Sequence, residues 1–161
     1  MSTNKKNYYL WLRQGEIMFS KACEYGIRAV IYIAEQSLDN RKVGLRELAN
    51  AIDSPVAYTS KILQLLTQNQ LIISEKGPTG GYYIDKSKLE KVTLSKIVYA
   101  IDGDSIYKGC GLGLHKCNEK MPCPVHFQFK LIRDQLKEML ETTTLLDLAL
   151  GKKHGLSVLK R

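Results

Sequence analysis

Three amphipathic segments followed by a glycine-rich hairpin constrain the fold of this chain more than any other feature. Apolar residues recur at helical spacing over residues 20–36, 45–52 and 55–68, and a proline at position 55 fits the first turn of the third segment. Residues 71–75 and 82–85 resemble short strands on either side of the sequence G-P-T-G-G. Three helices followed by a hairpin form a winged helix-turn-helix. The chain is therefore predicted to be mainly α-helical, with a small β wing.

Two further amphipathic regions and a cysteine-rich loop complete the expected organisation. Apolar spacing indicates a helix over residues 94–101, a longer helix from about Phe127, and a short last helix over residues 145–150. An exposed stripe of apolar residues on the long helix would be costly in water, so we expect this helix to pair two copies of the chain. The expected parts are a disordered leader at 1–17, a winged helix-turn-helix domain at 18–90, a linking helix and cysteine-rich loop at 91–126, and the dimerisation helix with the C-terminal tail at 127–161.

Charge and composition limit the classes of protein to which the chain can belong. The formal net charge of +8 favours a polyanionic partner such as double-stranded DNA, but charge alone does not decide between DNA and other partners. No apolar run approaches the roughly 20 residues that a membrane span requires. Residues 8–12 are too short for the apolar core of a signal peptide. We expect a cytoplasmic protein without a membrane partner.

The third helix and the hairpin carry the residues expected to contact DNA. The apolar positions predicted to face the core are Tyr58, Ile62, Leu65 and Leu66. The opposite face is polar, and no carboxylate that would repel phosphate occurs between Asp53 and Glu75. The N-terminal half of such a helix enters the major groove, and glycines in a wing let the backbone approach a phosphate. The candidate DNA-binding residues are Thr59, Ser60, Lys61 and Gln64 on the helix, and Lys76, Gly80 and Gly81 on the wing.

The loop before the long helix concentrates potential metal ligands. Three of the four cysteines and two of the three histidines lie within residues 110–126. The best spacing places Cys110, Cys117, Cys123 and His126 around one centre, which suits a zinc ion, a 2Fe–2S cluster or a 4Fe–4S cluster. The fourth cysteine, Cys23, lies on the apolar face of the first helix and is predicted to be a small core residue.

Several segments together resemble the Rrf-type winged-helix regulators, the family of the iron–sulfur cluster regulator IscR and the nitric-oxide-sensitive repressor NsrR. The similarity extends from about Phe19 to Leu150. It rests on S-K-A-C-E-Y-G-I-R-A at residues 20–29, R-E-L-A at 46–49, K-I-L at 61–63, G-P-T-G-G-Y at 77–82 and the three-cysteine loop that ends in P-V-H.

The resemblance implies a homodimer in which the long helix crosses its partner. It also implies that Cys110, Cys117 and Cys123 hold an iron–sulfur cluster and that His126 matches the fourth ligand in the IscR branch. Two positions differ from that branch. Six residues separate the first two cysteines where the branch commonly has five, and Ser60 replaces an acidic base-reading residue, so the operator sequence cannot be transferred.

The leading expectation is therefore a dimeric transcriptional regulator, a repressor that binds a palindromic operator and senses redox state, nitric oxide or iron–sulfur status through its cluster. A zinc-structured or thiol-redox regulator of the same fold is the first alternative. An iron–sulfur electron carrier is less well supported, because no second cofactor motif and no acid–base constellation accompanies the cysteines. An interaction adaptor that binds no DNA is the remaining alternative. None of the leading readings is an enzyme.

Overall fold

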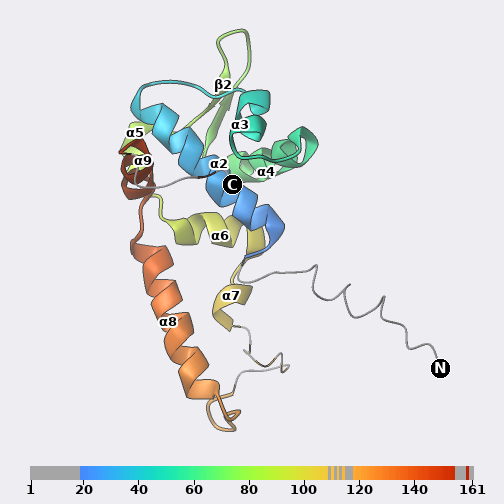
Figure 1. Ribbon diagram of the computed structural model, residues 1–161, viewed down its shortest axis with the longest axis vertical. Helices are drawn as coiled ribbons and strands as arrows, with labels where there is room; N and C mark the ends of the chain where they lie inside the picture. The colour runs from blue at the N-terminus through green and yellow to red at the C-terminus, as the bar shows by residue number, and fades with distance from the viewer. Residues whose placement is uncertain are drawn as a thin grey trace, which may run out of the picture.

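The computed structural model describes residues 19–108, 110, 112, 114, 118–154 and 159. A helical domain with a two-stranded wing lies at one end, and one long helix projects from the other (Figure 1). The predicted fold class, mainly α-helical with a small β wing, is confirmed. The elements in chain order are α2 (Lys21–Leu38), α3 (Leu45–Ala51), α4 (Val56–Gln68), β1 (Ile73–Glu75), β2 (Gly81–Tyr83), α5 (Lys86–Leu89), α6 (Leu94–Asp102), α7 (Ser105–Lys108), α8 (His126–Thr142) and α9 (Leu145–Lys153).

Helix α2 runs through the middle of the winged domain. Ser20 caps its N-terminus, because the side-chain oxygen accepts a hydrogen bond from the backbone N–H of Cys23. The helix packs against α3, α4, α6 and α9. Cys23 is fully buried, as its place on the apolar face of the helix predicts. Helix α2 is thus the element around which the other helices assemble.

Helices α3 and α4 form the helix-turn-helix. Asp53 adopts a positive φ of 53° in the turn between them, and α4 begins directly after Pro55. Ile62, Leu63 and Leu66 anchor α4 in the main core. These contacts leave the opposite face of α4 in solvent, where it can meet a ligand.

The wing is a short antiparallel pair in which Ile73 lies opposite Tyr83 and Glu75 opposite Gly81. Two glycines are required there for steric reasons. A Cβ on Gly80 would lie 2.2 Å from the carbonyl oxygen of Glu75, and Gly81 has a φ of +148° with a Cβ position 2.9 Å from the carbonyl oxygen of Val43. The glycine-rich sequence therefore shapes the wing itself, whatever it contacts.

Helix α9 returns to the winged domain. Leu145 and Ala149 are fully buried in the same core as α2 and α4. Two backbone hydrogen bonds hold the entrance to α9 beside that of α6, one from the N–H of Leu94 to Thr143 and one from the N–H of Leu145 to Val92. The last helix therefore packs as part of the winged domain, whereas the sequence patterns grouped it with the tail of the long helix.

The rotation of α4 differs from the prediction. Tyr58, expected in the core, is 36% exposed, and Leu63, which was not expected there, is fully buried. The third helix also starts one residue later than expected, and Pro55 is its N-cap. The short helices α5 and α7 were not predicted from the sequence. No helix in the described part of the chain is long and apolar enough to cross a membrane, and the predicted leader at 1–17 lies outside the described residues.

Candidate nucleic-acid interface and metal site

The exposed face of α4 carries three of the four helix residues predicted to contact DNA. Lys61 and Gln64 are exposed one turn apart, and Ser60 beside them is half-buried. The residues that anchor α4 lie on its other side, so this polar face is available to a partner. Hydroxyl, amide and ammonium groups of this kind can bond base edges or phosphates.

Thr59 does not lie on the exposed face of α4 where it was predicted to contact DNA. Its side chain is fully buried, and its hydroxyl donates to the Oγ of Ser54 at 2.9 Å and to the carbonyl of Pro55 at 3.0 Å. The prediction placed Thr59 on the reading surface because it lies in the N-terminal half of the helix. A threonine on the buried side of a helix can satisfy its own hydroxyl through the preceding turn, as it does here.

Tyr58 is the exposed residue that the sequence patterns missed. Its ring meets the edge of Tyr25 with centroids 5.7 Å apart, and the guanidinium of Arg28 lies 4.9 Å from the centre of the Tyr25 ring. These contacts hold Tyr58 at the N-terminal end of α4, where helices of this class approach DNA. The phenolic hydroxyl of a tyrosine is the one signal in the sequence that could have placed it at the surface.

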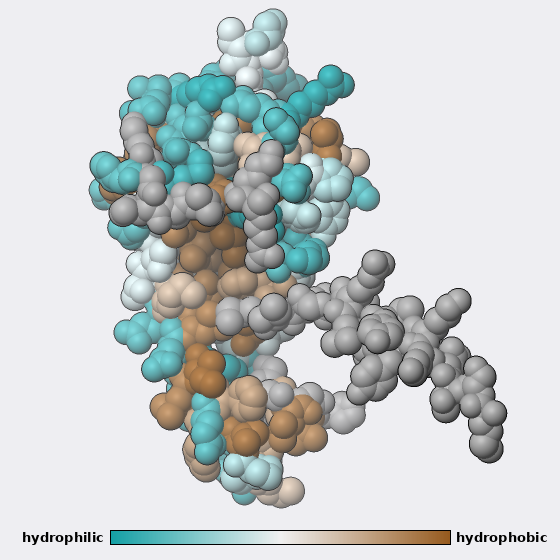
Figure 2. Space-filling model, viewed as in Figure 1, coloured by the Kyte–Doolittle hydropathy of each residue, from teal (hydrophilic) through white to brown (hydrophobic). Residues whose placement is uncertain are grey.

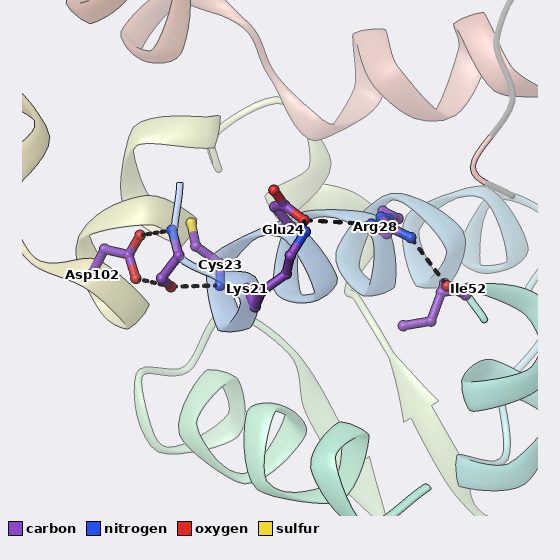
Figure 3. Close-up of polar contacts among 7 residues, drawn as sticks. Lys21, Cys23, Glu24, Arg28, Ile52 and Asp102 are labelled. Carbon is purple, nitrogen blue, oxygen red and sulfur yellow. Dashed lines mark hydrogen bonds and ion pairs between the residues drawn. The ribbon is translucent and has the colours of Figure 1, made fainter. Parts of the chain in front are cut away.

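A polar network fixes α2 to both neighbouring parts of the domain (Figure 3). At its N-terminus, Asp102 at the end of α6 accepts hydrogen bonds from the backbone N–H and the hydroxyl of Ser20. Burial, followed by the charge of Asp102, raises the pKa of the Cys23 thiol to about 12, so this cysteine stays protonated. Further along α2, Arg28 donates to the carbonyl of Ile52 at 3.3 Å, next to the turn that leads into α4.

The wing presents Lys76 as an exposed cation beside the glycine turn. Its neighbour Glu75 forms an ion pair with Lys42 at 2.8 Å, and the ammonium of Lys42 lies 5.4 Å from the centre of the Tyr83 ring. The carboxylate of Glu75 is thereby paired with a lysine. Lys76 then supplies an exposed positive charge on the wing with which a phosphate could interact.

Two of the predicted metal ligands, Cys110 and Cys123, are brought together. The backbone N–H groups of Leu112 and Leu114 lower the pKa of the Cys110 thiol, and the Cys123 side chain and the charge of Arg133 lower it further. Cys110 and Cys123 are both free thiols and partly exposed. The lowered pKa favours the thiolate form of Cys110, the form that soft metals bind.

The other two predicted ligands are not both placed at this pair. Cys117 lies outside the described residues. His126 is only 3% exposed, stands at the first position of α8, and donates its backbone N–H to the carbonyl of Cys123 at 3.0 Å. Within the described ranges, no group of three or more His, Cys, Asp or Glu side chains is arranged to hold a metal ion. His126 thus adjoins the thiol pair along the chain but does not complete a three-ligand set with it there.

An ion pair ties the cysteine loop to the same helix. Lys130 in the second turn of α8 contacts Glu119 at 2.5 Å. The hydrogen bond and charge of Lys130 lower the pKa of Glu119, and Glu119 in turn raises the pKa of Lys130. The loop is therefore tied to the start of α8 by a side-chain contact as well as by the chain itself.

Several known proteins are similar to this chain in sequence or in fold. A model of the Rrf2 family, described as an iron-dependent transcriptional regulator, matches residues 19–150. A protein of Aquifex aeolicus (strain VF5), named as an HTH-type transcriptional regulator, is 29% identical over 141 residues, which cover 86% of this chain and 96% of that protein. The HTH-type transcriptional regulator IscR of Pectobacterium carotovorum subsp. carotovorum (strain PC1) is 25% identical over 128 residues, which cover 80% of this chain and 76% of IscR.

Solved structures agree on the fold. CymR of B. subtilis, described as its global cysteine regulator, has a TM-score of 0.67 at 24% identity and covers 82% of this chain and 95% of its own. IscR of T. potens has a TM-score of 0.65 at 16% identity, with 86% and 90% covered. Because the family model matches most of its length, the chain belongs to the Rrf2 family of transcriptional regulators.

Proposed function

We propose that this protein is a homodimeric repressor whose binding to operator DNA depends on an iron–sulfur cluster held by the cysteine loop. The observation that carries the sensing part of the proposal is the close approach of Cys110 and Cys123 at the entrance to α8. Two thiols that meet where a long helix begins can convert occupation of the loop into a change in the position of that helix.

The DNA-binding part rests on α4 and the wing. The polar face of α4 with Ser60, Lys61 and Gln64 is proposed to enter the major groove, and Lys76 with the glycine turn to contact the backbone of the same duplex. The net charge of +8 supports a polyanionic partner. Tyr58 joins this surface as a phosphate-contacting residue, since it is 36% exposed in the first turn of α4.

The residues of the loop fit a cluster by their chemistry. Cys110 and Cys123 supply two neighbouring thiols, and the proposal adds Cys117 and His126 as the remaining ligands. When bound, an iron–sulfur cluster supplies a redox-active centre that oxygen or nitric oxide can destroy. The chain's own contribution is to anchor the loop on α8, through the backbone contact between His126 and Cys123 and the ion pair between Glu119 and Lys130.

Dimerisation is proposed to run through α8. Hydrophobic residues spread over α6 and down α8 (Figure 2). The exposed apolar side chains on α8 are Phe127, Leu131, Ile132 and Met139. A face of this kind gains free energy when a second copy covers it. A movement of α8 would then alter the spacing of the two α4 helices, on which binding to two half-sites depends.

The test uses full-length protein purified without oxygen. We expect a coloured protein with bound iron and sulfide and with operator affinity that changes when the cluster is removed. Replacing Cys110, Cys117 and Cys123 together by alanine should abolish iron and sulfide, because no other described group gathers comparable ligands. Cys23→Ala is the matched control and should keep both, since that thiol is buried in another part of the molecule. Full iron content in the triple variant would contradict the proposal.

A thiol-redox or zinc-structured regulator is the second candidate, and the same pair of thiols supports it. Cys110 and Cys123 are close enough to interact through their side chains, so oxidation could join them in a disulfide. The metal analysis separates the candidates. A colourless protein with zinc favours the structural metal, and a metal-free protein whose operator affinity changes reversibly with a dithiol reductant favours the thiol switch.

A further inference from the structure

An open cavity of about 400 Å³ lies where α6, α7 and α8 meet the segment that follows α4. Neither the DNA-binding surface nor the cysteine loop contributes to it. Its volume lies within the roughly 300–1,000 Å³ typical of small-molecule sites. The side chains that carry the argument are Lys96 and Tyr99 from α6, Tyr107 from α7, Glu141 from α8 and Leu71 after α4.

The cavity offers one cation and one carboxylate. Lys96 donates a hydrogen bond to the carbonyl of Lys91 at 2.8 Å, which leaves two further N–H groups on its ammonium for a ligand. Glu141 has a loose ion pair with Lys137 at 3.9 Å. Both charged groups are exposed, so neither needs to break a buried contact before it can bind a ligand.

Aromatic and apolar groups form the rest of the lining. Tyr99 is 66% exposed, and Leu71 is buried beneath the cavity. The hydroxyl of Tyr107 is buried, and no hydrogen-bond partner for it exists among the described residues. The negative charge of Glu141 is close enough to raise the pKa of Tyr107, after the larger effect of burial, so the phenol and the carboxylate are neighbours.

We infer that this cavity binds a free α-amino acid with an apolar or aromatic side chain. The ammonium of Lys96 attracts the ligand carboxylate, and Glu141 attracts the ligand ammonium, with the tyrosine rings adding cation–π attraction. The ligand side chain packs against Leu71 and the ring of Tyr99. A ligand that carries both charges satisfies the two ends of the site together, whereas an amine or an acid alone leaves one end unmatched.

The site has a regulatory consequence. Its walls come from the end of the helix-turn-helix, from α6, from the short helix that leads into the cysteine loop, and from α8. A ligand there favours one placement of α8 against the winged domain. An effect of the ligand on operator affinity rests on the proposed function, whereas binding of the ligand itself does not.

The test is isothermal titration calorimetry of the full-length protein with L-phenylalanine, phenethylamine and 3-phenylpropionate. The last two probes keep the ring and remove the carboxylate or the ammonium. We expect L-phenylalanine to bind and each partial analogue to bind roughly tenfold more weakly, the size of effect typical for loss of a charged hydrogen bond. Glu141→Gln and Lys96→Gln should each lower the affinity for L-phenylalanine by a similar factor.

Glu138→Gln is the matched control, because it removes a carboxylate from α8 outside the cavity and should leave the affinity for L-phenylalanine unchanged. The inference is overturned if L-phenylalanine does not bind, if both cavity variants bind it as the parent protein does, or if either partial analogue binds as tightly as the amino acid. Failure here leaves operator binding and iron content untouched, so it is distinguishable from failure of the proposed function.

Discussion

Individual side chains on α4 either support the fold or face solvent. Thr59 is buried, and its hydroxyl forms hydrogen bonds with Ser54 and Pro55. Lys61 and Gln64 lie on the exposed side and make no contact that the core requires. Lys76 on the wing is exposed as well. Replacing a residue that contacts bases should therefore change DNA binding in a different way from replacing a residue that contacts phosphate.

We expect Gln64→Ala to lose about 1–3 kcal/mol of discrimination at one base position, because an amide that bonds a base edge is removed. Lys76→Ala should weaken operator and random DNA alike and lower the salt slope by about one, because one phosphate contact is lost. Titrations of operator and scrambled duplex at several salt concentrations measure both effects.

Thr59→Val is the control for this pair. It should lower the free energy of unfolding by about 1 kcal/mol, through the lost hydrogen bonds of a buried hydroxyl, and leave the sequence preference intact. If Thr59→Val relaxes the preference and Gln64→Ala does not, the assignment of the reading face of α4 is wrong.

At the scale of whole elements, the joint between α8 and α9 is fixed by a capping box. The side chain of Thr144 accepts from the backbone N–H of Asp147 at 3.2 Å, and the carboxylate of Asp147 accepts from the backbone N–H of Thr144 at 3.1 Å. Because α9 packs on α2 and buries Leu145 in the main core, this cap stabilises the winged domain as well as its own helix.

The capping box makes a pH-dependent contribution to stability. The hydroxyl and backbone N–H of Thr144 lower the pKa of Asp147 below its ordinary value of 3.8. The stabilisation is therefore present above that ordinary value and is lost as the pH falls through the lower, folded value. Asp147→Asn should lower the melting temperature at pH 7, and its difference from the parent protein should shrink in melts taken below about pH 4.

Asp134→Asn serves as the control, since Asp134 is an exposed carboxylate in the middle of α8. It should leave the melting temperature close to that of the parent at both pH values. A pH-independent deficit for Asp147→Asn would mean that its carboxylate does not stabilise the helix through its charge.

For the molecule as a whole, α8 extends away from the winged domain (Figure 1). Several of its apolar side chains are exposed. Only two of its residues, His126 and Leu140, are buried within the chain. Ile132 is 56% exposed and Leu131 66% exposed. Side chains of this kind contribute little to the folding of one copy and would contribute most to pairing two.

We expect Ile132→Glu to convert the proposed dimer into a folded monomer, because a carboxylate buried at an apolar interface costs several kcal/mol. Lys137→Glu places the same side chain on an exposed polar position of α8 and should remain a dimer. Light scattering after size-exclusion chromatography gives the mass of each variant, and circular dichroism checks the fold. A monomeric parent protein, or a dimeric Ile132→Glu variant, contradicts pairing through this face.

The sequence by itself determined the order of elements and the place in the chain where potential metal ligands gather. Helical spacing of apolar residues predicts α2, α3, α4, α6 and α8, and the turn G-P-T-G-G predicts the wing, because these signals depend on residues close together in the chain. The dense group of cysteines and histidines at residues 110–126 can also be recognised from the sequence, because ligand type and spacing are local properties.

Only the tertiary structure decided which side of α4 is buried and where α9 belongs. Tyr58 and Leu63 are both apolar enough for a core, and the packing of α2 and α3 against α4 selects Leu63. Leu145 packs in the same core as residues of α2, which lie more than a hundred residues earlier in the chain. Lys96 and Glu141 are also far apart in the sequence, yet both line one cavity. Such pairings depend on how distant elements pack, which the periodicity of a single segment cannot encode.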